Sequence, residues 1–414
     1  MEFSNKLIEL AAEAEKNLVD IFARIDQTSF YNTNKIIDAF RNHKVCDAMF
    51  SGTSGYGYDD KGRDTLDLIW SDIFDCEASL VRTQIVSGTH ALTIGLFGLL
   101  RPGDLLLSVA GKPYDTLDEV IGVTGQAGNG SLADFGVKYR VIDLKNGRLD
   151  LEAIRETLLK EKVKVVFVQR SKGYLDRRTL TVDEIGELVK IVKSISPDSF
   201  VYVDNCYGEF TDVKEPTAVG ADLCVGSLIK NAGGGMAETG GYLCGTAKAV
   251  ELVSYRLTSP GTGGEVGCTL GQNKSLYKGL FYAPHTTAQA LKTAHFAAYI
   301  FSALGYETEP SWDTVRSDII QTVKTHSREG LCAICRGIQS GSPVDAFVTP
   351  EPWAMPGYSD EVIMAAGNFT QGSSIELSAD GPLREPYIAY FQGGLTYEAG
   401  KLGILSAAQE LTKI

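Results

Sequence analysis

VYVDNCYGEF at 201–210 and GSLIKNAGGG at 226–235 are the stretches from which most of the architecture and chemistry of this chain can be read. The first is a hydrophobic strand pattern that ends at Asp204, and the second sets Lys230 among small residues. A lysine can hold the aldehyde of pyridoxal phosphate as a Schiff base, while a carboxylate keeps the pyridine nitrogen protonated, so that the ring accepts electrons from a substrate carbanion. Asp204 and Lys230 therefore predict a pyridoxal phosphate site.

Short β-branched runs alternate with amphipathic stretches around these motifs, from about residue 76 to residue 250. The expected helices include 91–100, 149–160 and 182–195. This alternation predicts an α/β fold with a mostly parallel sheet of seven strands, helices on both faces, and ligands at the carboxyl ends of the strands. The expected strands are 84–88, 104–110, 138–144, 164–169, 200–205, 223–227 and 240–245.

The chain is too long for one ordinary core, and we expect two large lobes. Residues 1–75 are expected to form an N-terminal helical arm and a loop, and residues 76–284 the large α/β domain that binds the cofactor. Residues 285–414 are expected to form a smaller C-terminal α+β domain, which a long helix opens near Pro284.

Charge and hydropathy exclude several classes of partner. The net charge of −13 repels a nucleic acid on average. The longest apolar runs are far shorter than the roughly 18 residues that span a bilayer. The N-terminus, MEFSNKLIELAAEAEK, lacks the basic start and apolar block of a secretory signal. We therefore expect a cytoplasmic protein that binds a small molecule and neither nucleic acid nor membrane.

The cysteines and histidines are not spaced as metal ligands. The eight cysteines are scattered, and buried free thiols are their expected state in a chain of this size. CAIC at 332–335 has no second pair near it, and His285, His295 and His326 have no cysteine or carboxylate at ligand spacing. No metal site is predicted.

The run SGTHALTIGLFGLL, from Ser87 onward, has the pattern of a phosphate site. A strand ends, Ser87, Gly88 and Thr89 make a turn, and an apolar helix begins, whose N-terminus offers backbone N–H groups to an anion. Ser227, three residues before Lys230, can add a hydroxyl from the opposite side.

Tyr114, in GKPYDTLDEVIG, is a candidate for the face of the pyridine ring. An aromatic side chain there could stack on the ring, and its hydroxyl could relay a proton to a leaving group. The alternative is a tyrosine that closes a turn.

The order SGTH, PYDT, VDNCY and SLIKNAGG resembles the fold-type-I enzymes of the cystathionine and methionine γ-lyase group. The chain is more closely similar to the aluminium-resistance, or methionine γ-lyase family, proteins of bacteria, through GYGYDDKGRD at 55–64, LRPGDLLL at 100–107 and QRSKGY at 169–174. The likeness covers roughly residues 50–400 and implies the fold of pyridoxal phosphate-dependent transferases.

The resemblance also implies roles for individual residues. Lys230 would be the Schiff-base lysine and the base for the α-proton, Asp204 the partner of the pyridinium, and Tyr114 the stacking group. The phosphate cup would consist of Gly88, Thr89 and Ser227, beside Ser87.

In the γ-lyase group a tyrosine, and an arginine two residues after it, reach the phosphate from a neighbouring subunit. Tyr56 falls near that tyrosine, and Tyr58 stands where the arginine would be, so the arginine is missing; Arg63 is a candidate substitute. The resemblance implies a homo-oligomer, a dimer of active dimers.

Arginines are candidates for two further contacts, one with the substrate carboxylate and one with the cofactor ring. The resemblance implies that a late arginine holds the substrate carboxylate. Arg384, in SADGPLREPY, is preferred to Arg336, with a solvated surface arginine as the alternative. Arg170 is expected where a polar group would approach the 3-hydroxyl of the ring.

The predicted function is that of a pyridoxal phosphate-dependent carbon–sulfur lyase acting on a sulfur amino acid of the cystathionine, methionine or cysteine type. One alternative is transamination or another reaction of the same lysine-bound cofactor, because these chemistries share one site. A cysteine desulfurase would need a nucleophile on a mobile loop, for which Cys268 is the candidate. The last alternative is a non-catalytic sensor or binding protein in aluminium stress.

Overall fold

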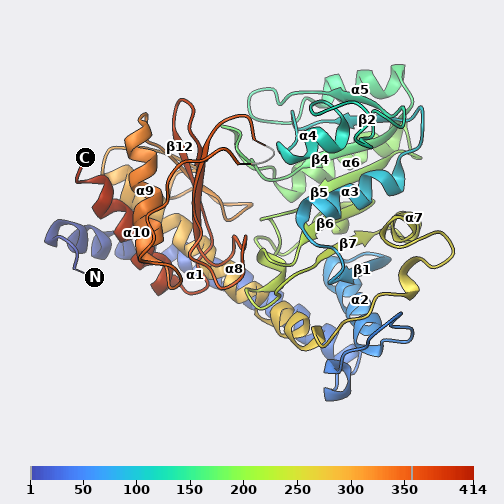
Figure 1. Ribbon diagram of the computed structural model, residues 1–414, viewed down its shortest axis with the longest axis horizontal. Helices are drawn as coiled ribbons and strands as arrows, with labels where there is room; N and C mark the ends of the chain where they lie inside the picture. Colours follow the sequence, from blue (N-terminus) through green and yellow to red (C-terminus); the bar gives the residue numbers. More distant parts are fainter. Residues whose placement is uncertain (1, 356–357) are drawn as a thin grey trace.

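The computed structural model describes residues 2–355 and 358–414, and its larger sheet has seven strands. These strands are β1 (Ala78–Arg82), β2 (Leu105–Ser108), β3 (Lys138–Val141), β4 (Val163–Gln169), β5 (Phe200–Asp204), β6 (Leu223–Ser227) and β7 (Gly241–Gly245). Their order across the sheet is β1-β7-β6-β5-β4-β2-β3 (Figure 1). Only β7 runs antiparallel to its neighbours in this sheet. The predicted mostly parallel seven-stranded sheet is confirmed.

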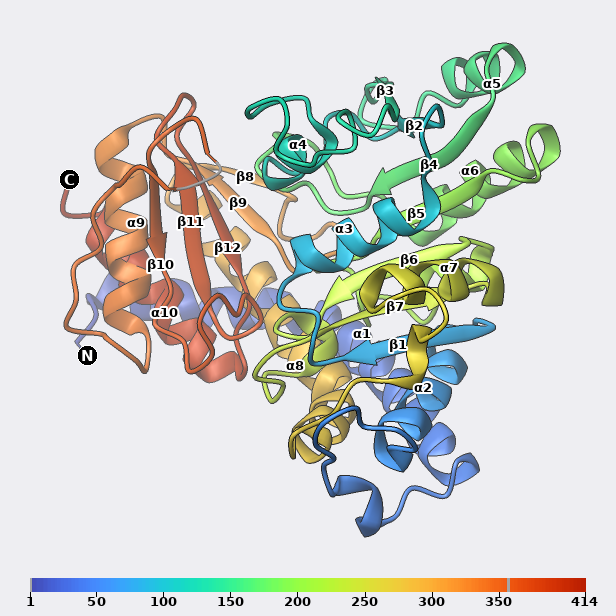
Figure 2. The same ribbon diagram turned by 45° about the vertical axis from the view of Figure 1, so that its right-hand side comes forward.

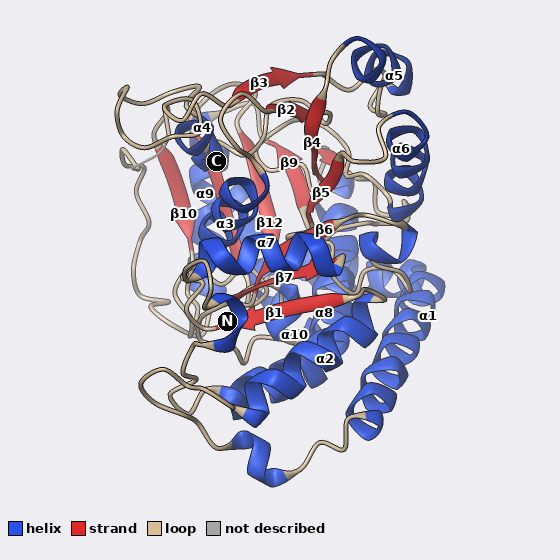
Figure 3. Cartoon of the chain, turned by 90° about the vertical axis from the view of Figure 1, so that its right-hand side faces the viewer, coloured by secondary structure: helices blue, strands red, loops and turns tan. Residues whose placement is uncertain are grey.

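The sequence of β4 explains why helices cover both faces of this sheet. Val165 and Phe167 pack into one apolar cluster and Val166 and Val168 into another, because successive side chains of a strand point to opposite faces. Figure 3 shows α5 and α6 on one side of the sheet and α3 on the other. The surrounding helices are α2 (Lys61–Phe74), α3 (Gly88–Leu99), α4 (Thr116–Ile121), α5 (Leu151–Lys160), α6 (Val182–Ile195) and α7 (Ala247–Leu257).

The strand expected at 84–88 is wrong, because the strand beside β7 is β1, at 78–82. Residues 83–87 instead make the turn into α3, and Val86 in this turn is 72% exposed. The true strand contains Arg82, which sequence reasoning places outside a core. The Arg82 guanidinium is buried because it donates to both carboxylate oxygens of Asp67, at 2.8 Å each.

A second, antiparallel sheet has the order β10-β11-β12-β9-β8. One of its faces packs against α9 and α10, and the other faces the larger sheet through Ile388 and Tyr390, which pack with Tyr174 (Figure 2). The predicted smaller α+β part is therefore present. Its elements are β8 (Glu307–Glu309), β9 (Gln321–Lys324), α9 (Arg328–Gly341), β10 (Val362–Ala365), β11 (Ser378–Pro382), β12 (Ile388–Gln392) and α10 (Tyr397–Leu411).

Two long helices, α1 (Asn5–Asn42) and α8 (Asn273–Ala303), run along both parts of the molecule (Figure 1). The helix expected to open near Pro284 begins at Asn273 and includes this proline. Proline favours a helix start, but residues 276–283 bury apolar side chains in the core of the large part, and this packing outweighs the local preference. Short 3₁₀ turns lie at Asp47–Phe50, Pro216–Val219, Asn231–Gly233 and Gly263–Glu265.

The eight cysteines are free thiols, and Cys332 and Cys335 of the CAIC stretch are buried in α9. Within residues 2–355 and 358–414, His, Cys, Asp and Glu side chains do not converge in groups of three or more that could hold a metal ion. None of the helices that the structure describes combines the length and the apolar character needed to cross a membrane.

Candidate active site

A pocket lies between the carboxyl ends of β4, β5 and β6 and the face of the second sheet that carries Tyr390. This is the edge of a parallel sheet at which ligands bind. Six of the predicted residues line it: Ser87, Gly88, Thr89, Tyr114, Asp204 and Lys230. The second sheet contributes Met364, Ser378, Asp380, Tyr390 and Gln392, and the loop before β11 contributes Gly372, Ser373 and Ser374.

Lys230 follows β6 and reaches the floor of the pocket. Its Nζ lies 3.9 Å from the centre of the Tyr207 ring. Burial disfavours the ammonium form, but Cys206, Tyr207 and Asp204 outweigh burial and raise the pKa of Lys230 above its ordinary value. Before a ligand arrives, Lys230 is therefore a charged donor held against an aromatic face.

Asp204 closes β5 and is 6% exposed. Its Oδ1 accepts a hydrogen bond from the backbone N–H of Cys206, at 3.1 Å. Burial raises the pKa of Asp204, and the charge of Lys230 and the Cys206 N–H oppose this rise. The carboxylate is thus placed to pair with a positively charged nitrogen in the pocket.

The N-terminus of α3 meets the pocket at the Ser-Gly-Thr turn. Ser87 is the N-cap, and its hydroxyl accepts from the backbone N–H of His90 at 3.0 Å. A Cβ built on Gly88 would lie 3.6 Å from Ser227 Cβ and 4.0 Å from Lys230 Nζ, so these three residues adjoin. Ser227 itself lies behind the pocket lining.

The Ser227 hydroxyl is buried and has no hydrogen-bond partner among the residues that the structure describes. A buried hydroxyl of this kind needs a partner, and an anionic oxygen at the N-terminus of α3 would supply one. With Asp204 and Lys230 in the same pocket, the residues present fit pyridoxal phosphate: an anion cradle, a carboxylate and a lysine.

Tyr114 lies in the loop after β2, with its backbone N–H donating to Gln169 Oε1 at 2.6 Å. Its hydroxyl hydrogen-bonds the hydroxyl of Tyr358, and its ring lies 5.8 Å from the ring of Tyr174. Burial raises the pKa of Tyr114 well above its ordinary value. The side chain is therefore a neutral hydroxyl that can donate a hydrogen bond inside the pocket.

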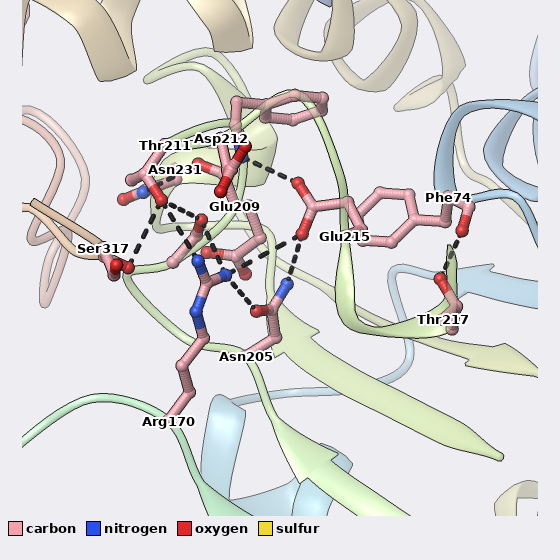
Figure 4. A network of polar contacts seen from close by, with 12 residues as sticks. Phe74, Arg170, Asn205, Glu209, Thr211, Asp212, Glu215, Thr217, Asn231 and Ser317 are labelled. Carbon is pink, nitrogen blue, oxygen red and sulfur yellow. Dashed lines mark hydrogen bonds and ion pairs between the residues drawn. The ribbon is translucent and has the colours of Figure 1, made fainter. Parts of the chain in front are cut away.

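The expectation for Arg170 is wrong. Its guanidinium donates to Asn205 Oδ1 at 2.8 Å and to the Gly208 carbonyl at 3.0 Å, and it lies 4.0 Å from Glu215 (Figure 4). The neighbouring residue, Gln169, lines the pocket instead. Adjacent side chains of an extended chain point in opposite directions, so Gln169 faces the pocket and Arg170 points away from it.

The expected substrate arginine is also misplaced. Arg384 is 44% exposed in its side chain and pairs with Asp360 at 2.9 Å, and Arg336 pairs with Glu351 at 2.7 Å. Neither arginine lines the pocket. The alternative of a solvated surface arginine fits both positions.

Tyr56 and Tyr58 lie outside the pocket, with exposed fractions of 74% and 59% and their rings stacked 5.6 Å apart. The Arg63 guanidinium is buried beneath the loop that carries them, where it donates to the carbonyls of Gly57, Glu265 and Gly267. A contact from these tyrosines to a neighbouring subunit stays a prediction. Arg63 is occupied within its own chain.

Several lining residues were missed from the sequence. Cys206 and Tyr207 lie in the quoted strand-end motif and follow Asp204 closely, so a turn that brings them back to the site could have been anticipated. Tyr207 makes this turn with φ of 73°. Asp380 and Gln392 have no such signal, because their strands are far from the motifs in the sequence.

The arrangement has counterparts among known proteins. The uncharacterized protein YnbB of Bacillus subtilis (strain 168) is 52% identical over 98% of this chain and 96% of its own length. The crystal structure of a carbon–sulfur lyase involved in aluminium resistance, from Clostridium novyi NT, matches with 49% identity and a TM-score of 0.94, over 98% of this chain and 96% of that chain.

A more distant structure shares the fold alone. The pyridoxal-5′-phosphate-dependent protein YhfS of Escherichia coli is 16% identical, with a TM-score of 0.62, over 95% of this chain and 97% of that chain. The family model for methionine gamma-lyase matches residues 7–412, almost the whole sequence. This chain therefore belongs to the methionine gamma-lyase family.

Proposed function

We propose that this chain is a pyridoxal phosphate-dependent carbon–sulfur lyase that acts on a sulfur amino acid. The observation that carries the proposal is that Lys230 and Asp204 line the same pocket, beside the N-terminus of α3. The description of the Clostridium novyi relative as a carbon–sulfur lyase supports the same reaction class. When bound, the cofactor supplies an electron sink that makes the α-proton of an amino acid acidic.

The chain's own residues have separate tasks in this proposal. Ser87, Gly88 and Thr89 hold the phosphate at a helix N-terminus. Asp204 would pair with the ring nitrogen and favour its protonated form, and Lys230 Nζ would take the α-proton. The Tyr114 hydroxyl, which lines the pocket and hydrogen-bonds Tyr358, would donate a proton to the departing sulfur.

An amino-acid screen with the purified protein tests the proposal. Cystathionine, methionine and cysteine are incubated with the cofactor-loaded protein, while its absorbance spectrum and the release of ammonia and α-keto acid are followed. Lyase activity predicts that thiol and ammonia appear together and that Lys230→Ala abolishes both. Keto acid production by a colourless Lys230→Ala variant would refute the role of this lysine.

The same screen tests the other candidate functions. Conversion of the cofactor to its pyridoxamine form, without thiol release, would indicate an aminotransferase. No reaction with any amino acid, beside tight binding of aluminium, would indicate a sensor. A desulfurase based on Cys268 is not supported, because Cys268 does not line the pocket and its carbonyl accepts from Gln84 at the surface.

We infer further that the active form is a homo-oligomer. The exposed, stacked rings of Tyr56 and Tyr58 form an aromatic surface of the kind that protein interfaces bury. Light scattering of the purified protein measures its mass directly. A dimer or tetramer that a Tyr56→Ala, Tyr58→Ala variant weakens is expected, and a monomer with full lyase activity would contradict this inference.

A further inference from the structure

The pocket wall formed by the second sheet carries a carboxylate with an open acceptor position. Asp380 of β11 is 7% exposed and lines the pocket. Its Oδ2 accepts from Gln392 Nε2 at 3.1 Å, whereas its Oδ1 is buried and has no hydrogen-bond partner within the described parts of the chain. A buried acceptor without a partner is unfavourable, so a group that donates a hydrogen bond to this oxygen is favoured there.

The charges around Asp380 favour a cation as that group. Burial raises the pKa of Asp380 to about 7, and the side chains of Tyr174 and Gln392 and the charge of Lys230 oppose the rise. A pKa near 7 leaves part of the carboxyl ionised at neutral pH, and an ammonium group beside it favours the ionised form, so a cationic ligand is favoured over a neutral one.

The surfaces beside Asp380 suit an alkyl chain that ends in an ammonium group. Tyr174 and Tyr390 pack against each other, with ring centres 5.1 Å apart, and both line the pocket together with Met364. Aromatic faces attract cations, and a methionine side chain packs well against a thioether or methylene chain.

We propose that Asp380 binds an ammonium group on the side chain of the substrate, and so selects amino acids that carry a second amino group, such as a thioether linking two amino acids. This inference rests on the proposed lyase function. Asp380 is then a specificity-determining residue: it discriminates between substrates by the charge at the far end of their side chains, while Lys230 acts at the α-carbon.

Two non-sulfur amino acids of equal length test the inference by binding alone. Ornithine and norleucine have side chains of four heavy atoms and differ in the terminal ammonium. Each is titrated into the cofactor-loaded protein, with the cofactor absorbance and the thermal midpoint as readouts. Wild-type protein is expected to bind ornithine about 10-fold more tightly than norleucine, a difference of about 1.4 kcal/mol.

The variant Asp380→Asn keeps the shape of the side chain and is expected to bring this ratio close to one. Asp360→Asn makes the same change at a carboxylate that pairs with Arg384 outside the pocket, and should keep the ratio. Equal binding of the two amino acids by wild-type protein, or an unchanged ratio in Asp380→Asn, would overturn the inference.

Failure of this inference is distinguishable from failure of the proposed function. If only the role of Asp380 is wrong, both amino acids still perturb the cofactor spectrum, but without preference. If the lyase function is wrong, the sulfur amino acids release no thiol, whichever of ornithine and norleucine binds more tightly. The wild-type titration gives the binding ratio even when Asp380→Asn does not fold.

Discussion

The two walls of the pocket present their charges differently. On the wall built by the large sheet, Asp204 and Lys230 compensate each other, and a backbone N–H also satisfies the carboxylate. On the wall built by the second sheet, one carboxylate oxygen of Asp380 has no hydrogen-bond partner among the residues that the structure describes. Compensated charges suit a cofactor that stays bound, whereas an acceptor without a partner suits a substrate that binds and then leaves.

The large-sheet wall should be the more sensitive of the two, and Lys230→Ala is the strongest test. We expect a loss of lyase activity of about 10³–10⁴-fold, because both the attachment of the cofactor and the base for the α-proton disappear. Steady-state release of thiol and the absorbance spectrum measure the loss. A variant with more than a tenth of wild-type activity would place the essential lysine elsewhere.

Asp204→Asn probes the partner of the ring nitrogen without changing the shape of the side chain. Losing the charge should lower kcat by about 10²-fold, since one preorganised electrostatic contact to the reacting system is removed. The comparison with Asp380→Asn is direct: the Asp204 change should act on every substrate alike, and the Asp380 change mainly on substrates with a second ammonium. Equal patterns in the two variants would erase the distinction between the walls.

Arg170→Met tests whether this side chain supports the large-sheet wall from behind. It leaves Asn205 Oδ1 without its donor and buried Glu215 without its counter-charge, which should lower the free energy of unfolding by about 3 kcal/mol (Figure 4). Urea denaturation measures the change, with Arg384→Met as the matched surface variant. A stability equal to that of wild-type protein would mean that the network contributes nothing.

The pH dependence of stability separates a carboxyl group buried behind the wall from one in the pocket. Burial raises the pKa of Glu209 to about 8, although its Oε1 accepts from the Tyr242 hydroxyl at 2.9 Å. Because the folded state retains this proton, its contribution to stability is greatest near pH 4.5 and is lost as the pH rises toward 8.

Glu209→Gln should therefore be more stable than wild-type protein at pH 8.5, by an amount on the order of 1 kcal/mol, and less distinct from it at pH 5. Chemical denaturation at the two pH values gives the comparison. The opposite sign would show that the carboxylate is ionised and stabilised in the folded state.

Arg384→Ala is expected to have the smallest effect, because exposed ion pairs contribute at most about 1 kcal/mol. Kinetics with a sulfur amino acid should give a KM within about twofold of the wild-type value, since the side chain lies outside the pocket. A KM raised about 10-fold or more would bring Arg384 back as the group that holds the substrate carboxylate.

The residues that sequence reasoning located are local features. Asp204 ends a strand, Ser87 caps a helix, and Lys230 follows a strand among small residues. A pattern of a few neighbouring residues therefore identifies each of them. No such pattern identifies Asp380, because it meets the site through the pairing of β11 with β12 and the packing of one sheet against another. Tertiary placement of this kind leaves no pattern in the sequence near the residue.

Arg170 and Arg82 illustrate a second cause of error, which is the paired burial of charge. Arg170, at a strand end, looks available for a ligand. Its partners, Asn205 and Glu215, are distant in the sequence, so their contacts with it cannot be read from the residues nearby. Arg82 lies within β1, and its counter-charge, Asp67, lies in the preceding helix α2. In both cases the sequence showed a charge and not the residue that satisfies it.

The long helices α1 and α8 each bury side chains in both apolar cores, and the first turn of α1 meets α10, where the Ser4 N–H donates to Gln409 Oε1 at 3.1 Å. The core around α9 and α10 therefore includes side chains of α1 (Figure 1). Heating should therefore melt the protein in a single cooperative step, and a fragment that starts at residue 285 should fail to fold by itself, because Leu7, Leu18 and their neighbours would be missing from its interior.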